Sequence, residues 1–369
     1  MTEHEPAAAV PRLHLVARSL FRGTPVWAFR AGMFLIQRSE TKRMNVDPVA
    51  GVAHTDNIDY AGDGHPAHRL DVIAPIPAAD ATDSRATASP AAGGTDARPL
   101  LPVYIYFHGG GWTSGDKTTV TKYCAHQAAT GMVVVNVNYR RAGRFQMDHQ
   151  IQDAGAAVRW VRENIRTHGG DPDRVVLGGD SAGGHIAALF TATSGSQELR
   201  AHFGMPAEQA APAVQGLVLH CSAVDFSMFF AAAPILGRGF VRLLQPRSTT
   251  AAPARRATLR EAATYLSPIE WIGPGHPAVF VTTSARDYFY ESNLRFVERL
   301  RAALVPVETI IYGSANANTL HTWQQNYRFP ESQTVWEHVT AFVNRVTALA
   351  EHPISLEQSV VGEHSVSLA

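Results

Sequence analysis

Between residues 101 and 349, short unbroken apolar runs alternate with longer stretches whose apolar residues recur at helical spacing. Runs without polar alternation are typical of strands buried on both faces, and such strands form mostly parallel sheets. The alternation therefore predicts an α/β fold with helices on both faces of the sheet. The predicted strands are residues 103–107, 132–137, 175–177, 217–220, 279–282 and 307–312, with a hairpin or strand pair at 60–74. The predicted helices are residues 119–130, 148–168, 290–303 and 331–349, and one that starts at Ser181.

The 369 residues fit one large domain with additions. We assign the main domain to residues 51–350. Residues 1–50 are predicted to be a partly helical extension that helps to cover a functional site of the main domain. Residues 78–99 are rich in Ala, Asp, Thr, Ser, Gly and Pro, which predicts a flexible surface loop. Residues 225–275 break the alternation with clustered aromatic residues and a basic, Ala-rich stretch, and are predicted to be a helical cap insertion. Residues 351–369 form a tail without a clear pattern.

The charges balance, with 32 Lys and Arg against 32 Asp and Glu, so we expect neither nucleic acid nor an anionic membrane as a partner. No run of about twenty uncharged apolar residues exists, so no membrane span is predicted. The first ten residues carry Glu3 and Glu5 without a basic region, unlike a signal peptide. Cys124 and Cys221 are interpreted as free thiols in a reducing, cytoplasmic compartment. The sequence is compatible with a monomer or a homodimer.

The segment Gly-Asp-Ser-Ala-Gly-Gly at residues 179–184 follows a predicted strand and opens a predicted helix. The pattern G-x-S-x-G in this context is typical of a nucleophile elbow, a sharp turn that exposes the serine. Positions two residues on either side must be tiny, because a Cβ atom there would collide with the adjacent chain. Ser181 is therefore the predicted nucleophile. The N–H group of Ala182, at the helix N-terminus, is predicted to stabilise an oxyanion.

A second segment, His-Gly-Gly-Gly-Trp at residues 108–112, directly follows another predicted strand. Glycines let backbone N–H groups approach a negatively charged tetrahedral intermediate. We predict that Gly110 and Gly111 complete the oxyanion hole with Ala182. The segment lacks the Lys-Ser/Thr ending of a phosphate-binding P-loop. The supporting residues of this loop are predicted to be His108, Gly109 and Trp112, with His108 in a structural role.

A nucleophilic serine needs an imidazole to take its proton and a carboxylate to fix the imidazole's tautomer. In the chain order Ser, acid, His, the best candidates are Asp287 and His321, which each follow a predicted strand. Asp225 is the rival acid, and Asp287 has the alternative role of a helix N-cap. Three later histidines fit worse, because they lie in a predicted helix or in the tail: His338, His352 and His364.

Aromatic residues near these segments are candidates for the wall of a substrate pocket, with core packing as an equal alternative. They are Tyr139, Phe226, Phe229 and Trp323. Asp153 and Asp180 are interpreted as structural residues that accept hydrogen bonds under the elbow.

At these residues the sequence resembles the hormone-sensitive-lipase-like family of esterases, which pairs an HGGG-W…GD segment with GDSAGG. The matching pieces span roughly residues 55–350: residues 108–112 with Gly115 and Asp116, residues 179–184, Tyr-Leu-Ser-Pro at 265–268, the strand at 277–282, Asp287 and His321. The resemblance implies an α/β-hydrolase fold with about eight strands and a helical cap. It also implies a carboxylesterase for acyl esters of short to medium chain length. The predicted triad acts through an acyl-enzyme and requires no metal or organic cofactor.

The sequence departs from the family pattern at two places that bear on the substrate. Residues 141–144 read Arg-Ala-Gly-Arg instead of Leu-Ala-Pro-Glu, and residues 320–323 read Leu-His-Thr-Trp instead of a Gly-Phe-like context. His185 is shared with kynurenine-formamidase-like and feruloyl-esterase-like relatives. An amidase or formamidase on the same triad is therefore the alternative enzyme. The non-enzymatic alternative is a ligand-binding module on this scaffold, although such modules usually lose a triad member.

Overall fold

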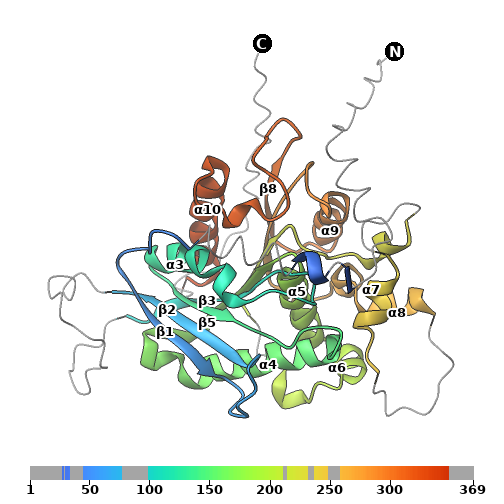
Figure 1. Ribbon diagram of the computed structural model, residues 1–369, viewed down its shortest axis with the longest axis horizontal. Coiled ribbons are helices and arrows are strands. Elements are labelled where there is room, and N and C mark those ends of the chain that lie inside the picture. The colour runs from blue at the N-terminus through green and yellow to red at the C-terminus, as the bar shows by residue number, and fades with distance from the viewer. Residues whose placement is uncertain are drawn as a thin grey trace.

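The computed structural model describes residues 27–28, 30–33, 45–76, 99–210, 214–231, 237–247 and 258–348 (Figure 1). Most of residues 1–50 and 78–99, and all of residues 351–369, lie outside this part of the chain. The predicted N-terminal extension, surface loop and tail therefore stay predictions.

One sheet of eight strands forms the centre of the described structure (Figure 1). The strands follow the spatial order β1-β2-β4-β3-β5-β6-β7-β8. β2 pairs antiparallel with β1 and with β4, and every other pair is parallel. This confirms the predicted mostly parallel sheet. The bounds are β1 Val52–Asp59, β2 Arg69–Pro75, β3 Leu101–Phe107, β4 Val133–Val137, β5 Gly170–Asp180, β6 Gly216–His220, β7 Ala278–Ser284 and β8 Val307–Tyr312.

Helices cover both faces of the sheet, as the alternation predicts. α3 (Thr121–Ala129) and α10 (Pro330–Val346) pack on one face. α4 (Met147–Asn164), α5 (Ala182–Gly195) and α9 (Tyr290–Ala302) pack on the other. α6 (Gln197–Phe203) packs against α4 and α5. Within the described residues, no helix is long and apolar enough to cross a membrane.

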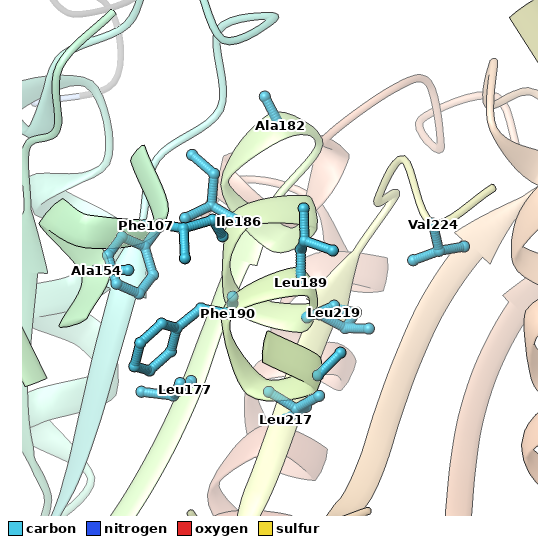
Figure 2. Close-up of a cluster of buried hydrophobic side chains, with 14 of the residues drawn as sticks. Phe107, Ala154, Leu177, Ala182, Ile186, Leu189, Phe190, Leu217, Leu219 and Val224 are labelled. Carbon is cyan, nitrogen blue, oxygen red and sulfur yellow. The ribbon is translucent and has the colours of Figure 1, made fainter. Parts of the chain in front are cut away.

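The period of two along a strand sends successive side chains of β3 into different cores. Val103, Ile105 and Phe107 belong to the core under α4, α5 and α9, whereas Tyr104 and Tyr106 belong to the core under α3 and α10. Figure 2 shows part of the first core, where side chains of α5 meet those of the neighbouring strands. Because both faces are buried, β3 carries no polar alternation.

Between β6 and β7, the described residues form only short helices. They are η4 (Phe226–Phe230), α7 (Gly239–Leu244), α8 (Leu259–Tyr265) and η5 (Pro268–Trp271). α8 contacts α7 and η4, and η5 contacts α5. Figure 1 shows α7 and α8 next to each other. These helices, called the short-helix segment below, lie within residues 225–275, and the role of these residues as a cap stays a prediction.

The predicted strand pair at residues 60–74 is partly wrong, because residues 60–68 form the connection between β1 and β2. Asp59 closes this connection by accepting N–H groups from Gly62 at 2.9 Å and Gly64 at 2.8 Å. β1 escapes detection because it is an edge strand with exposed polar residues and no apolar run. β5 likewise begins at Gly170, earlier than predicted, because its first half carries charged residues.

Candidate active site

The C-terminal ends of β3, β5, β6, β7 and β8 lie at one edge of the sheet, because these strands are parallel. The register is level across this edge, with Phe107 opposite Gly179, Asp180 opposite His220, and His220 opposite Thr282. The loops that follow these strands carry all the predicted catalytic side chains. The topology thus explains how residues distant in the sequence come together.

Ser181 lies in the turn between β5 and α5 with φ 51° and ψ −115°. This left-handed φ is strained for a residue with a side chain. The turn is also crowded, since a Cβ atom at Gly179 or Gly183 would collide with the backbone oxygen of Phe107. These contacts supply the steric reason for small residues two positions before and after the serine. Ser181 itself is almost completely buried, with 8% of its surface exposed.

A continuous hydrogen-bond chain joins three side chains from three loops. His321 Nε2 lies 2.9 Å from Ser181 Oγ, and His321 Nδ1 lies 2.6 Å from Asp287 Oδ1. The other Asp287 oxygen accepts the Thr283 hydroxyl at 3.1 Å. An ionised carboxylate only accepts, so Nδ1 carries the ring proton and Nε2 is free to accept the serine proton. The arrangement therefore has the geometry of a nucleophile, a general base and an orienting acid.

The Gly-rich loop after β3 lies against the elbow. Gly110 and Gly111 have left-handed φ values of 130° and 58°. Within the described residues, the N–H groups of Gly110, Gly111 and Ala182 have no acceptor. A Cβ atom at Gly183 would also collide with the backbone oxygen of His108, which shows how closely loop and elbow approach. N–H groups without an acceptor, in a loop that packs against the elbow, suit a developing negative charge.

A buried carboxylate under the elbow fixes this loop. Asp180 Oδ1 accepts the N–H of Gly109 at 2.9 Å and the hydroxyl of Tyr106 at 2.9 Å. The Asp180 side chain also occupies the space that a Cβ atom at Gly109 would need. Asp180 therefore has the structural role assigned to it from the sequence. Asp153 does not, because it lies on α4 and binds Arg140 and His68 instead of the elbow.

A family model described as the alpha/beta hydrolase fold matches residues 104–321, which include every residue of this hydrogen-bond chain. The chain belongs to this alpha/beta hydrolase family. It is 33% identical over 230 residues to carboxylesterase NlhH of Mycobacterium tuberculosis, which covers 59% of this chain and 68% of NlhH. It is 31% identical over 235 residues to esterase LipI of the same organism, which covers 58% of this chain and 65% of LipI.

Solved structures show the same fold. Esterase B from Lactobacillus rhamnosis superposes with a TM-score of 0.69 at 21% identity, over 90% of this chain and 96% of that one. The esterase from Pyrobaculum calidifontis gives a TM-score of 0.62 at 22% identity, over 92% and 99%. Together with the mycobacterial relatives, the family match makes the protein a carboxylic ester hydrolase of the hormone-sensitive-lipase-like group. The comparisons give no support to the amidase alternative.

Asp225, the alternative acid in this alpha/beta hydrolase, binds residues other than the triad histidine. Asp225 accepts two hydrogen bonds from the guanidinium of Arg295, at 2.6 and 3.0 Å, and one from Ser227 N at 2.8 Å. Asp287, in contrast, directly contacts the imidazole of His321. The geometry thus favours Asp287 as the acid of the triad.

His185 links three parts of the hydrolase, a role that no local sequence pattern indicates. Its Nδ1 accepts the Trp112 indole N–H at 2.9 Å, and its Nε2 donates to the backbone oxygen of Leu266 at 2.7 Å. His185 thereby joins the Gly-rich loop, the first turn of α5 and the short-helix segment. These two bonds require the neutral tautomer with the proton on Nε2.

The four candidate pocket residues are buried in this structure, which favours the alternative of core packing. Tyr139 stacks on His108, with ring centroids 4.6 Å apart, and donates its hydroxyl to the His108 backbone oxygen. Phe226 and Phe229 are fully buried against Trp112. Trp323 begins the short helix η6 (Trp323–Gln325) and packs in the other core, under α3 and α10.

Replacing Gly183 with alanine is expected to lower the free energy of unfolding by at least about 3 kcal/mol, because the new methyl group meets backbone oxygens that cannot move aside. Gly195→Ala is the matched control, since a Cβ atom at this other α5 glycine meets nothing within 4 Å. Its expected effect is within about 0.5 kcal/mol. Urea unfolding of both variants checks this. Equal stabilities would contradict the proposed crowding at the elbow.

The hydrolase is expected to lose stability as the pH falls below 6.5. Burial lowers the pKa of His108 and of His185 to about 4, and the pKa of His220 to about 3. The unfolded chain binds protons at these histidines between pH 6.5 and 4, whereas the folded chain does not, so protonation favours unfolding. Between pH 7 and pH 5, each of these histidines is expected to lower the free energy of unfolding by on the order of 2 kcal/mol.

Asp180 acts with the opposite sign, because burial raises its pKa to about 6. Its protonation below pH 6 favours the folded state, and between pH 7 and pH 5 it raises the free energy of unfolding by about 1 kcal/mol. The destabilisation by the three histidines is larger than the stabilisation by Asp180, so the net free energy of unfolding is expected to fall. Urea unfolding at pH 7 and pH 5 measures the balance, and an equal or higher free energy of unfolding at pH 5 would contradict this prediction.

Among the described residues, one group of His, Cys and acidic side chains brings potential metal ligands together. Atoms of Cys221, Asp287 and His321 all lie within 4.8 Å of one another. Two of these residues belong to the hydrogen-bond chain described above, and the third lies immediately behind it.

Proposed function

We propose that this hydrolase cleaves carboxylic esters through a covalent acyl-enzyme on Ser181. Ser181 Oγ attacks the ester carbonyl while His321 Nε2 takes its proton, and Asp287 orients the imidazole and stabilises its cation. His321 then protonates the leaving alcohol and later activates the water that releases the acid. The N–H groups of Gly110, Gly111 and Ala182 stabilise the oxyanion, each contributing about 3–4 kcal/mol.

One observation carries this proposal. The 2.9 Å and 2.6 Å contacts form an unbroken path from Ser181 Oγ through the imidazole to Asp287. The hydroxyl is thus already paired with its base, and the base with its orienting acid. The N–H groups of Gly110, Gly111 and Ala182, which have no acceptor among the described residues, support the assignment of the oxyanion hole.

We further propose that the acyl chain is short to medium in length. Trp112 follows the oxyanion donor Gly111 directly, and its ring contacts Phe226, Phe229 and Phe240. These rings are buried and form a filled core next to the Gly-rich loop. A filled core beside the site limits the pocket volume.

The prediction for a series of p-nitrophenyl esters is that kcat/KM is highest for chains of about eight carbons or fewer and falls steeply for palmitate. The measurement is initial-rate kinetics with the butyrate, octanoate and palmitate esters. Faster hydrolysis of palmitate, or of emulsified long-chain triglyceride, would contradict the limited pocket without affecting the assignment of the nucleophile.

A further inference from the structure

Cys221 lies directly behind the triad, although the proposed reaction does not use it. It follows the last residue of β6, is completely buried, and has a left-handed φ of 48°. Its thiol sulfur, an oxygen of Asp287 and a ring nitrogen of His321 all lie within 4.8 Å of one another. Three different ligand types, from three different loops, thus lie close together.

The thiol of Cys221 is held in place from several sides. Gln324 Nε2 donates to the sulfur at 3.4 Å and to Thr282 Oγ1 at 2.7 Å. The Cys221 N–H donates to the Thr282 backbone oxygen at 2.8 Å, and Trp336 fixes the Gln324 backbone oxygen at 2.7 Å. The Cys221 thiol is therefore held in a defined position by neighbouring groups, as a metal ligand requires.

Thiolate sulfur, imidazole nitrogen and carboxylate oxygen are the three protein ligands of Zn²⁺ and of related soft divalent cations. We propose that Cys221, Asp287 and His321 form an inhibitory binding site for a thiophilic divalent cation such as Zn²⁺ or Cd²⁺. The ion acts as an inhibitor and not as a cofactor. The proposal goes beyond the esterase function, and only its activity readout rests on that function.

The geometry shows what the ion must displace. His321 Nδ1 and Asp287 Oδ1 are 2.6 Å apart, whereas tetrahedral zinc ligands stand about 3.4 Å from each other. Binding must therefore part the hydrogen bond between Asp287 and His321, and the ion takes the place of the Nδ1 proton. Because the Asp287 and Cys221 side chains are buried, the ion reaches them past the partly exposed imidazole.

Inhibition follows from the tautomer that the ion imposes. When Nδ1 binds the ion, the ring proton moves to Nε2, and the Cys221 thiol releases its own proton to solvent. Nε2 then presents an N–H instead of a lone pair to Ser181 Oγ, so it cannot accept the serine proton. The expected signature is a loss of kcat that a chelator reverses, while the serine itself is unmodified.

The test measures the binding of Cd²⁺ to metal-free protein in two independent ways. One is inhibition of p-nitrophenyl butyrate hydrolysis, and the other is the ultraviolet charge-transfer band of a cadmium–thiolate bond. The variants are Cys221→Ser and Cys221→Ala, with Cys124→Ser as the matched control. Cys124 is equally buried but belongs to no group of metal ligands within the described residues. Ser181→Ala serves to separate metal binding from catalysis.

We expect Cd²⁺ to inhibit the unaltered protein and EDTA to restore activity. The half-inhibitory concentration rises by at least about 10-fold in both Cys221 variants and is unchanged in Cys124→Ser. The cadmium–thiolate band is present in the unaltered protein, in Cys124→Ser and in Ser181→Ala, and is absent from the Cys221 variants. The band in Ser181→Ala reports the metal site even if the proposed catalytic role of Ser181 is wrong.

Two results would overturn the site. One is inhibition of equal strength in the Cys221 variants, and the other is a missing cadmium–thiolate band in the unaltered protein at inhibitory Cd²⁺. If neither Cys221 variant folds, the Cys124→Ser variant decides between the two cysteines. A cadmium–thiolate band that persists in Cys124→Ser arises from Cys221. A band that disappears in Cys124→Ser arises from Cys124 and contradicts the proposed site.

Discussion

Replacement of Ser181 by alanine is expected to lower kcat for p-nitrophenyl butyrate by about 10⁶-fold. The alanine has no oxygen that can form the acyl-enzyme, so only the oxyanion hole and substrate binding remain to accelerate the attack of water. Among the described residues, the removed hydroxyl forms a hydrogen bond with His321 alone, so the melting temperature is expected to stay within a few degrees of that of the unaltered protein.

Ser222→Ala is the matched control for this substitution. Ser222 is a buried serine beside the elbow, and among the described residues the one hydrogen bond of its hydroxyl is a long one of 3.4 Å to the His220 backbone oxygen. Its kcat is expected to stay within about threefold of that of the unaltered protein. Undiminished turnover by a folded Ser181→Ala protein would place the nucleophile elsewhere.

Asp287→Asn is expected to lower kcat by about 10⁴-fold. The amide nitrogen of asparagine donates a hydrogen bond to Nδ1, which turns the imidazole into the tautomer with its proton on Nε2. That nitrogen can then no longer accept the proton of Ser181. The substitution keeps the size of the side chain, and Thr283 can still donate to the amide oxygen, so the loss is expected in kcat with little change in stability.

Asp225→Asn controls for the loss of a buried charge near the same sheet edge. Asp225 pairs with Arg295, whose side chain is 46% exposed and can be solvated when the partner charge is removed. We expect kcat within about threefold of that of the unaltered protein. A loss of kcat as large in Asp225→Asn as in Asp287→Asn would remove the distinction between the two carboxylates.

The sequence predicted the strands of the sheet centre because they are buried on both faces and read as unbroken apolar runs. β3, with its side chains shared between two cores, is the clearest case. β1 was missed because an exposed edge strand needs no apolar pattern. The predictability of a strand thus depended on how far the sheet buries it.

The elbow and the Gly-rich loop were predictable because steric crowding restricts residue choice within a few positions. Asp287 and His321 were found through chain order, which the parallel topology converts into proximity. The pocket aromatics were not predictable, because an aromatic residue gives the same sequence signal in a core and in a pocket. Trp323 therefore appeared to be near the substrate, although it packs under α3 and α10.

Residues that act through a distant partner left no local signal. His185 contacts Trp112 and Leu266, which lie 73 and 81 residues away. Cys221 contacts Gln324 across 103 residues. Only the three-dimensional fold shows that these side chains support the Gly-rich loop or lie behind the triad.

Covalent labelling with a fluorophosphonate tests the assignment of the nucleophile most directly, because the reagent reacts only with a hydroxyl whose proton a neighbouring base removes. We predict one adduct per chain, with the phosphorus attached to the oxygen of residue 181, located by peptide mass spectrometry. An adduct at another residue, or a protein that hydrolyses esters without being labelled, would contradict the account.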